Sequence, residues 1–151
     1  IPLRILKHDF DLTLLDSLGK RVTWLEEACT RMNLPRTQCI HARAEEFSAS
    51  HRETFDLALS RAVAQLNILA ELTLPLVTVG GHFLAMKSVE SDEELDAAKP
   101  AIKLLGGKIC RVIDYRIPTS DISHRVVIIE KTGKTPEKYP RTFAKIKKNP
   151  L

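Results

Sequence analysis

The sequence predicts an α/β fold with a doubly wound, mainly parallel sheet. Short apolar runs alternate with segments of helical periodicity, an order typical of βαβ units. Polar residues also lie at or directly after the ends of several apolar runs, as Asp16, Ser60 and Lys87 do. Because ligands bind beyond the carboxyl ends of parallel strands, these residues are expected along one edge of the sheet.

Four apolar runs are expected to form the strands of the parallel part, at residues 10–15, 38–41, 55–60 and 82–87. Helical spacing of apolar residues and helix end signals predict the helices that separate them, at residues 1–8, 20–32, 44–47 and 63–75. The pair Gly80-Gly81 is expected to form a turn before the fourth strand.

The remainder of the ordered chain predicts one more helix and two strands. Ser91 precedes three acidic residues, which predicts an N-cap followed by acids where the helix dipole favours them, with the helix running to about Leu105. Residues 108–116 and 125–130 read as strands joined without a helix. They are therefore expected to pair in an antiparallel manner.

Composition narrows the class of protein. A length of 151 residues is ordinary for one domain, and no apolar run approaches the roughly 20 residues that span a bilayer. Three cysteines without a C-x-x-C pair and five histidines without ligand spacing predict no metal site. Reduced thiols in a cytoplasmic protein are the expectation. A start at Ile1 rather than Met suggests an incomplete N-terminus.

Positive charge is concentrated at the C-terminal end. Residues 131–151 carry a formal charge of +6, whereas residues 1–130 carry −2. This contrast predicts a core over 1–130 and a basic tail over 131–151. Such a tail either binds phosphate backbones or is a solvated terminus, and both alternatives stay open.

Asp16 is the first candidate for a binding residue. It follows an apolar run and precedes a short polar turn, and an acid at such a strand end can bind the hydroxyls of a ribose. Alternatively, Asp16 or Ser17 caps the next helix. The local sequence does not separate these two interpretations.

Four blocks of residues resemble one known family. Residues 13–21, 43–47, 60–64 and 138–141 occur in the order found in the ribosomal small subunit methyltransferase G family, also called glucose-inhibited division protein B. The likeness covers essentially all 151 residues, and the nine-residue block around Asp16 is the specific part of it.

The resemblance implies a function and a cofactor. Members use S-adenosylmethionine to methylate ring nitrogen 7 of a guanosine in the 530 loop of 16S ribosomal RNA, either free or within a small-subunit ribonucleoprotein. They have the Rossmann-like class I methyltransferase fold with an antiparallel last strand. The resemblance further implies that the first strand and its glycine-rich loop are missing from this chain.

The resemblance also assigns residues to roles. Asp16, with Ser17, corresponds to the ribose-binding acid, and Ala44 and Glu45 correspond to the pair beside the adenine. Arg61 corresponds to the arginine near the methyl-transfer end of the pocket. No general base is expected, because ring nitrogen 7 carries a lone pair and no proton. The expected RNA contacts are Lys138, Tyr139, Arg141, Lys145, Lys147 and Lys148. For Tyr139, packing on the domain is an equal alternative.

Two other functions remain open at this stage. A non-catalytic RNA-binding module would act through the basic tail alone, without affinity for S-adenosylmethionine. A nicotinamide-dependent dehydrogenase would also place an acid like Asp16 after its second strand. The chain shows no G-x-G-x-x-G motif, which disfavours the dehydrogenase.

Overall fold

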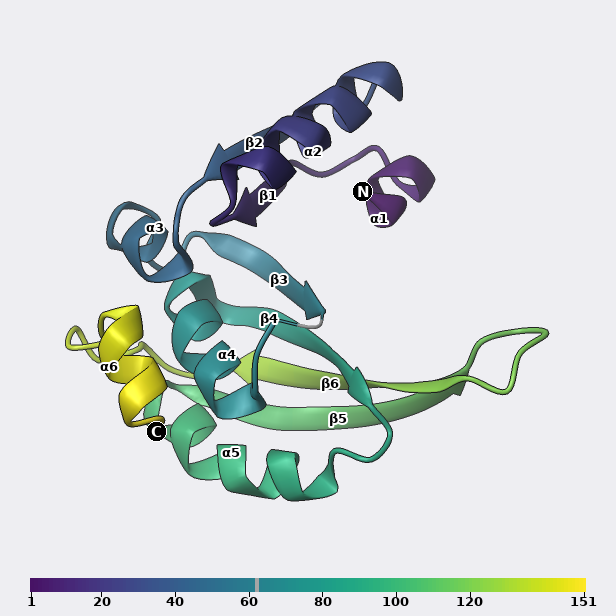
Figure 1. Cartoon of the computed structure of the whole chain (residues 1–151). Coiled ribbons are helices and arrows are strands. Elements are labelled where there is room, and N and C mark those ends of the chain that lie inside the picture. Colours follow the sequence, from purple (N-terminus) through teal and green to yellow (C-terminus); the bar gives the residue numbers. More distant parts are fainter. Residues whose placement is uncertain (62) are drawn as a thin grey trace. The chain divides into compact units, whose positions relative to one another are not determined.

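The computed structural model describes residues 1–61 and 63–151 (Figure 1). Ala62, which belongs to the block at residues 60–64, lies outside the described residues. The chain divides into two compact units, Ile1–Phe47 and Ser48–Leu151. Residues 131–151 belong to the second unit.

The first unit holds a two-stranded parallel sheet. Its elements are α1 (Pro2–Leu6), β1 (Leu12–Asp16), α2 (Gly19–Arg31) and β2 (Thr37–His41), followed by the start of α3 (Ala44–Ser50). β1 and β2 run parallel, with Leu12 opposite Thr37 and Asp16 opposite His41. Both strands occur within two residues of their predicted positions, although β1 is half-buried rather than fully buried.

The second unit is built on a four-stranded mixed sheet. Its elements are β3 (Phe55–Arg61), α4 (Leu66–Thr73), the 3₁₀ turn η1 (Leu74–Leu76), β4 (Val77–Ser88), α5 (Asp92–Leu104), β5 (Gly107–Arg116), β6 (Ser123–Lys131) and α6 (Phe143–Lys148). The strand order is β3-β4-β6-β5. β3 and β4 are parallel, whereas β6 is antiparallel to both of its neighbours. The expected antiparallel pair of final strands is thus confirmed.

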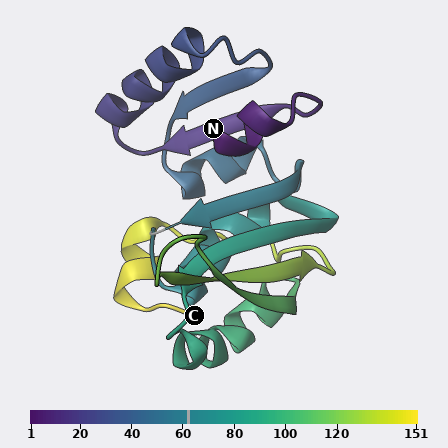
Figure 2. The ribbon, with the colours of Figure 1, turned by 90° about the vertical axis from the view of Figure 1, so that its right-hand side faces the viewer.

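The core of the second unit lies between the sheet and its helices. Figure 2 shows these helices beside the strands. Apolar side chains of α4 and α5 meet those of β4 and β6, and the most buried include Leu66, Phe83, Ala85, Ile102, Val127 and Ile129. Removing this much apolar surface from water is the main driving force for folding of the unit. Among the described helices, none has the length and apolar character needed to cross a membrane.

Two predicted details of the second unit are wrong. Val63 does not line a helix: it is exposed, and α4 begins three residues later at Leu66. The pair Gly80-Gly81 lies inside β4 and forms an irregularity there rather than a turn. Gly80 has a φ of +90°, and a Cβ on Gly81 would lie 2.7 Å from the Asp56 carbonyl oxygen. The glycines are needed because β4 bulges against β3 at this point.

Ser91 occupies the N-cap position of α5 as predicted, but it does not cap the helix through its side chain. Its hydroxyl donates instead to the carbonyl oxygen of Ser88 at 2.7 Å. The predicted acids do occupy the first turn of α5, and the helix continues through Pro100 to Leu104.

Residues 131–151 are packed rather than solvated. Lys131 and Ile146 are fully buried, and Thr135 and Tyr139 are nearly so. Three carbonyl oxygens of this segment, those of Thr135, Pro136 and Tyr139, accept hydrogen bonds from the guanidinium of Arg52. The segment is therefore part of the second unit's folded structure, while its lysines other than Lys131 remain available at the surface.

Candidate functional site

The parallel pairing of β1 and β2 brings four of the predicted residues to one edge. Because Asp16 lies opposite His41 in the register, the loops after the two strands leave the sheet at the same end. One loop carries Asp16 and Ser17, and the other leads into Ala44 and Glu45. This is the edge at which open α/β sheets bind ligands.

The carboxylate of Asp16 is held in place yet still open to solvent. Its Oδ1 accepts a hydrogen bond from the backbone N–H of Leu18 at 2.8 Å, and its Oδ2 lies 3.3 Å from the Arg21 guanidinium. Leu18 is the N-cap residue of α2, so Asp16 serves the start of that helix. Its side chain is 24% exposed, so oxygen lone pairs remain for a ligand. The two interpretations of Asp16 are therefore compatible.

His41 supports the loop that follows Asp16. Its Nε2 lies 3.1 Å from the carbonyl oxygen of Ser17, and since a carbonyl only accepts, Nε2 must carry the hydrogen. A Cβ placed on Gly19 would lie 3.4 Å from the His41 ring, so the loop passes close to the imidazole. No local sequence pattern indicates this role of His41, because the role depends on the register between β1 and β2.

Ala44 and Glu45 present a donor and an acceptor after β2. Ala44 is the first residue of α3, a position at which the backbone N–H has no partner within the helix. The Glu45 carboxylate accepts from Arg43 Nε at 2.7 Å, and this hydrogen bond raises the pKa of the Arg43 guanidinium. Only 10% of the Glu45 side chain is exposed, so its carboxylate is well fixed. A fixed carboxylate beside a backbone donor suits the edge of a purine.

Arg61 and Lys87 occupy the corresponding end of the second sheet. Arg61 is the last residue of β3, is exposed, and lies opposite Met86 of β4. The ammonium of Lys87, one residue further along β4, is bound internally: it donates to the Ala64 carbonyl oxygen at 2.7 Å and to Glu94 at 2.5 Å. Of these two cations, Arg61 is the one presented to solvent.

The six predicted RNA contacts fall into two groups. Lys138, Lys145, Lys147 and Lys148 are exposed. Tyr139 is only 7% exposed and belongs to the apolar core, which favours the packing alternative for this residue. Arg141 donates to both carboxylate oxygens of the buried Glu71. The four lysines are therefore the members of the set that are free to meet a phosphate backbone.

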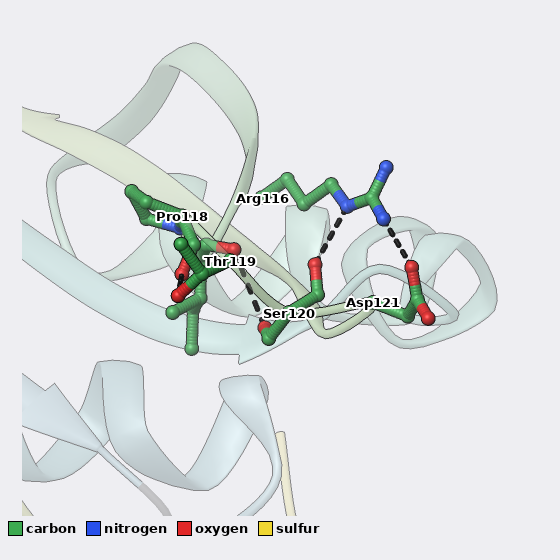
Figure 3. Close-up of a pocket in the computed structure, with 6 residues that line it drawn as sticks. Arg116, Pro118, Thr119, Ser120 and Asp121 are labelled. Atoms are coloured by element: carbon green, nitrogen blue, oxygen red, sulfur yellow. Dashed lines mark hydrogen bonds and ion pairs between the residues drawn. The ribbon is translucent and has the colours of Figure 1, made fainter.

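A concavity of about 420 Å³ lies in the loop between β5 and β6 and is lined by residues 116–121 (Figure 3). Arg116 closes it by donating to the Ser120 carbonyl oxygen at 2.7 Å and by pairing with Asp121. It contains none of the predicted site residues, and one loop supplies its whole lining, so we do not assign it a ligand. Within the described part of the chain, no cluster of three metal-binding side chains occurs.

The sequence matches known proteins over its whole length. Residues 1–122 match the family described as GidB, rRNA small subunit methyltransferase G. A protein from Clostridium botulinum (strain ATCC 19397 / Type A), named ribosomal RNA small subunit methyltransferase G, is 46% identical over 153 aligned residues. That alignment covers 100% of this chain and 64% of the relative, so the chain spans less than two thirds of the relative's length.

Solved structures of methyltransferases share the fold. The antibiotic-resistance methyltransferase Kmr superposes with a TM-score of 0.64 at 15% identity, covering 89% of this chain and 92% of Kmr. TYW2 from M. jannaschii, solved in complex with AdoMet, superposes with a TM-score of 0.61 at 12% identity, covering 80% of this chain and 58% of TYW2. The predicted fold, that of a Rossmann-like class I methyltransferase, is thereby confirmed.

Proposed function

We propose, from the premise that this chain belongs to the rRNA small subunit methyltransferase G family, that it serves S-adenosylmethionine-dependent methylation of 16S ribosomal RNA. In this proposal the methyl group is transferred to ring nitrogen 7 of a guanosine in the 530 loop. The reaction is proposed to take place in the cytoplasm. The observation that carries the proposal is the pairing of the Asp16 and Ala44-Glu45 loops at one sheet edge, within the sequence block that resembles the family.

The ribose of the cofactor is assigned to Asp16 and Ser17. The Asp16 carboxylate keeps one firm hydrogen bond, from Leu18, and one longer contact, to Arg21. Its remaining lone pairs accept from the two ribose hydroxyls in this arrangement. Because Leu18 and Arg21 already hold the Asp16 carboxylate in place, little ordering of this side chain is required when the ligand binds.

The adenine is assigned to Ala44 and Glu45. A backbone N–H at the start of α3 donates to a ring nitrogen, and the Glu45 carboxylate accepts from the exocyclic amino group. Arg43 holds that carboxylate at 2.7 Å, which fixes the distance between donor and acceptor. Such a pair discriminates adenine from bases whose edge reverses the donor and acceptor positions.

The transfer step makes modest demands on the protein. When bound, S-adenosylmethionine supplies a methyl group on a positively charged sulfur, and the guanine nitrogen attacks through its own lone pair. No side chain has to remove a proton. The contribution of the chain is to hold the acceptor in line with the methyl carbon and to exclude competing water, which accounts for a large share of the barrier reduction in such reactions. Arg61 is assigned to the methyl-transfer end of the cofactor, the role that the resemblance to the family implies for it.

The RNA is assigned to the exposed lysines of the last segment. Lys138 lies just before the buried Tyr139, and Lys145, Lys147 and Lys148 lie on or next to a single short helix, α6. Their charges release counterions from a phosphate backbone on binding, so RNA affinity is expected to fall steeply with salt. In this proposal the 16S RNA, alone or in the small subunit, is the partner.

Isothermal titration of S-adenosylmethionine and, separately, of NAD tests the class of function. Saturable binding of the first alone is expected. Binding of NAD alone would indicate a dinucleotide enzyme, and binding of neither, with salt-sensitive RNA binding retained, would indicate a non-catalytic RNA-binding module. Transfer of labelled methyl groups to 16S RNA, followed by mapping of the methylated base, tests the acceptor site.

A further inference from the structure

Two residues that follow Arg61 closely in the sequence, Ala64 and Leu66, are held by hydrogen bonds from other elements. The carbonyl oxygen of Ala64 accepts from the Lys87 ammonium at 2.7 Å. The backbone N–H of Leu66, the first residue of α4, donates to Glu94 Oε1 at 2.5 Å. These two bonds hold the backbone at Ala64 and Leu66, three and five positions after Arg61.

Both restraints come from one ion pair. Lys87 near the end of β4 and Glu94 in the first turn of α5 meet at 2.5 Å, with side chains 12% and 28% exposed. Partial exclusion of water strengthens their attraction relative to a surface pair. The pair therefore joins two elements of the core to a segment that would otherwise be an ordinary loop.

Glu94, a residue of α5, also caps the N-terminus of α4. Gln65, the N-cap residue of α4, makes no side-chain capping bond. The Glu94 carboxylate binds the first free N–H of α4 instead and places negative charge where the helix dipole favours it. A residue on another helix thus sets the point at which α4 begins.

The neighbouring charges are satisfied elsewhere. Arg125, which lies opposite Lys87 in the sheet, pairs with Asp114 and Asp92 at 2.6 and 2.7 Å. The Lys87–Glu94 pair is consequently the one directed at the segment after Arg61.

We propose that Lys87 and Glu94 are positioning residues for Arg61: the pair holds Ala64 and Leu66, which follow Arg61 closely in the sequence, and thereby sets where Arg61 meets the cofactor. The inference rests on the proposed function, which assigns Arg61 to the methyl-transfer end of the cofactor.

A double-mutant cycle tests the link between Glu94 and Arg61. The variants are Glu94→Ala, Arg61→Ala and the two together, with the affinity for S-adenosylmethionine measured by titration. If Glu94 acts through Arg61, each single change is expected to weaken binding about tenfold, and the double variant also about tenfold rather than a hundredfold. A hundredfold loss would show independent effects and overturn the inference, as would unchanged affinity in Glu94→Ala.

Two further variants separate positioning from loss of folding. Glu94→Gln keeps a side-chain acceptor for Leu66 and is expected to recover part of the affinity that Glu94→Ala loses, even if Glu94→Ala folds poorly. Asp96→Asn, on the same helix, alters an exposed pair with Lys99 and is expected to leave affinity unchanged. Equal losses in Glu94→Gln and Asp96→Asn would overturn the inference.

Amide hydrogen exchange distinguishes failure of this inference from failure of the proposed function. The Leu66 N–H is expected to exchange faster in Glu94→Ala than in the unaltered protein, and at the unaltered rate in Asp96→Asn. If the unaltered protein bound no S-adenosylmethionine, the proposed function and the role of Arg61 would both be overturned. An unchanged exchange rate at Leu66 would overturn the restraint of the segment itself.

Discussion

The buried carboxylate of Glu71 accepts three hydrogen bonds from Arg141. Oε1 accepts from the backbone N–H at 2.9 Å and from Nε at 2.8 Å, and Oε2 accepts from Nη2 at 2.6 Å. Glu71 lies in α4 and is fully buried, whereas the Arg141 side chain keeps 21% exposure. The carboxylate raises the pKa of the Arg141 guanidinium, so the guanidinium stays charged. A residue of the basic segment is therefore part of the interior of the second unit.

Replacing Arg141 with Met is expected to destabilise the protein by about 3–5 kcal/mol, because it leaves the Glu71 charge buried without its partner. Urea denaturation measures the change. Lys99→Met is the matched control: its partner Asp96 is exposed, and a loss of about 0–1 kcal/mol is expected there. Similar losses in the two variants would show that the buried pair contributes no more than a surface pair.

The positions of the strands could be predicted from the sequence, whereas the contact between Arg141 and Glu71 could not. β1, β2 and β3 lie within two residues of their predicted positions because each is a short apolar run with clear end signals. Arg141 looked like a free cation because the residues around it are basic and polar. Its partner Glu71 lies 70 positions away in the sequence, and no local pattern announces such a contact.

In the candidate site, too, features that depend on local sequence could be predicted, whereas features that depend on contacts between strands could not. The positions of Asp16, Ala44 and Glu45 at strand ends followed from local pattern and resemblance. The hydrogen bond between His41 and Ser17 depends on the register of β1 against β2, which period-two side-chain patterns do not fix in half-buried strands. Gly80-Gly81 was misread for a related reason: a glycine pair signals a turn locally, but here the partner strand dictates a bulge.

Replacing Lys145, Lys147 and Lys148 with Ala is expected to flatten the salt dependence of RNA binding. Three phosphate contacts to single-stranded RNA correspond to a loss of about 2 units from the slope of log affinity against log salt. Binding at several salt concentrations measures it. A triple variant of Lys99, Lys103 and Lys108, which are also exposed, controls for net charge. Equal flattening in both would make the effect one of total charge rather than of α6.

Glu53 is expected to contribute to loss of stability in acid. Burial raises the pKa of its carboxyl, but the Thr135 N–H and the Lys131 ammonium outweigh burial, so the pKa lies below its usual value of 4.5. A carboxyl with a lowered folded pKa contributes stability above its unfolded pKa and loses it as pH falls through the folded value.

The unfolding free energy should therefore decline below about pH 4.5, and Glu53→Gln should remove at most about 1.4 kcal/mol per pH unit from that slope. Denaturation curves between pH 3 and 7, chosen as roughly the span over which a carboxyl titrates, provide the measurement. Glu90→Gln, at an exposed site, is the control. A slope that is the same in Glu53→Gln and in the unaltered protein would contradict the expected coupling to Lys131.

Gly106 is expected to resist substitution. It follows α5 with a φ of +82°, and a Cβ would lie 2.2 Å from the Gly133 carbonyl oxygen. The left-handed backbone alone costs a residue with a Cβ about 1–2 kcal/mol, and the clash adds to it. Gly133→Ala is the matched control, since a Cβ there meets nothing within 4 Å. Thermal melts that lowered both variants equally would exclude the close approach as the cause.

Asp16→Ala is expected to weaken S-adenosylmethionine binding by about 1–3 kcal/mol, the usual loss when a ligand's hydrogen bonds to a charged acceptor are removed. The control is Asp11→Ala at the other end of β1, where an exposed carboxylate pairs with Arg36 and faces no predicted ligand. Titration of both variants decides the assignment. Because Asp16 also binds the Leu18 N–H, a fall in affinity counts only if the melting temperatures of the two variants agree. Unchanged affinity would remove Asp16 from the site and leave it as a support for the start of α2.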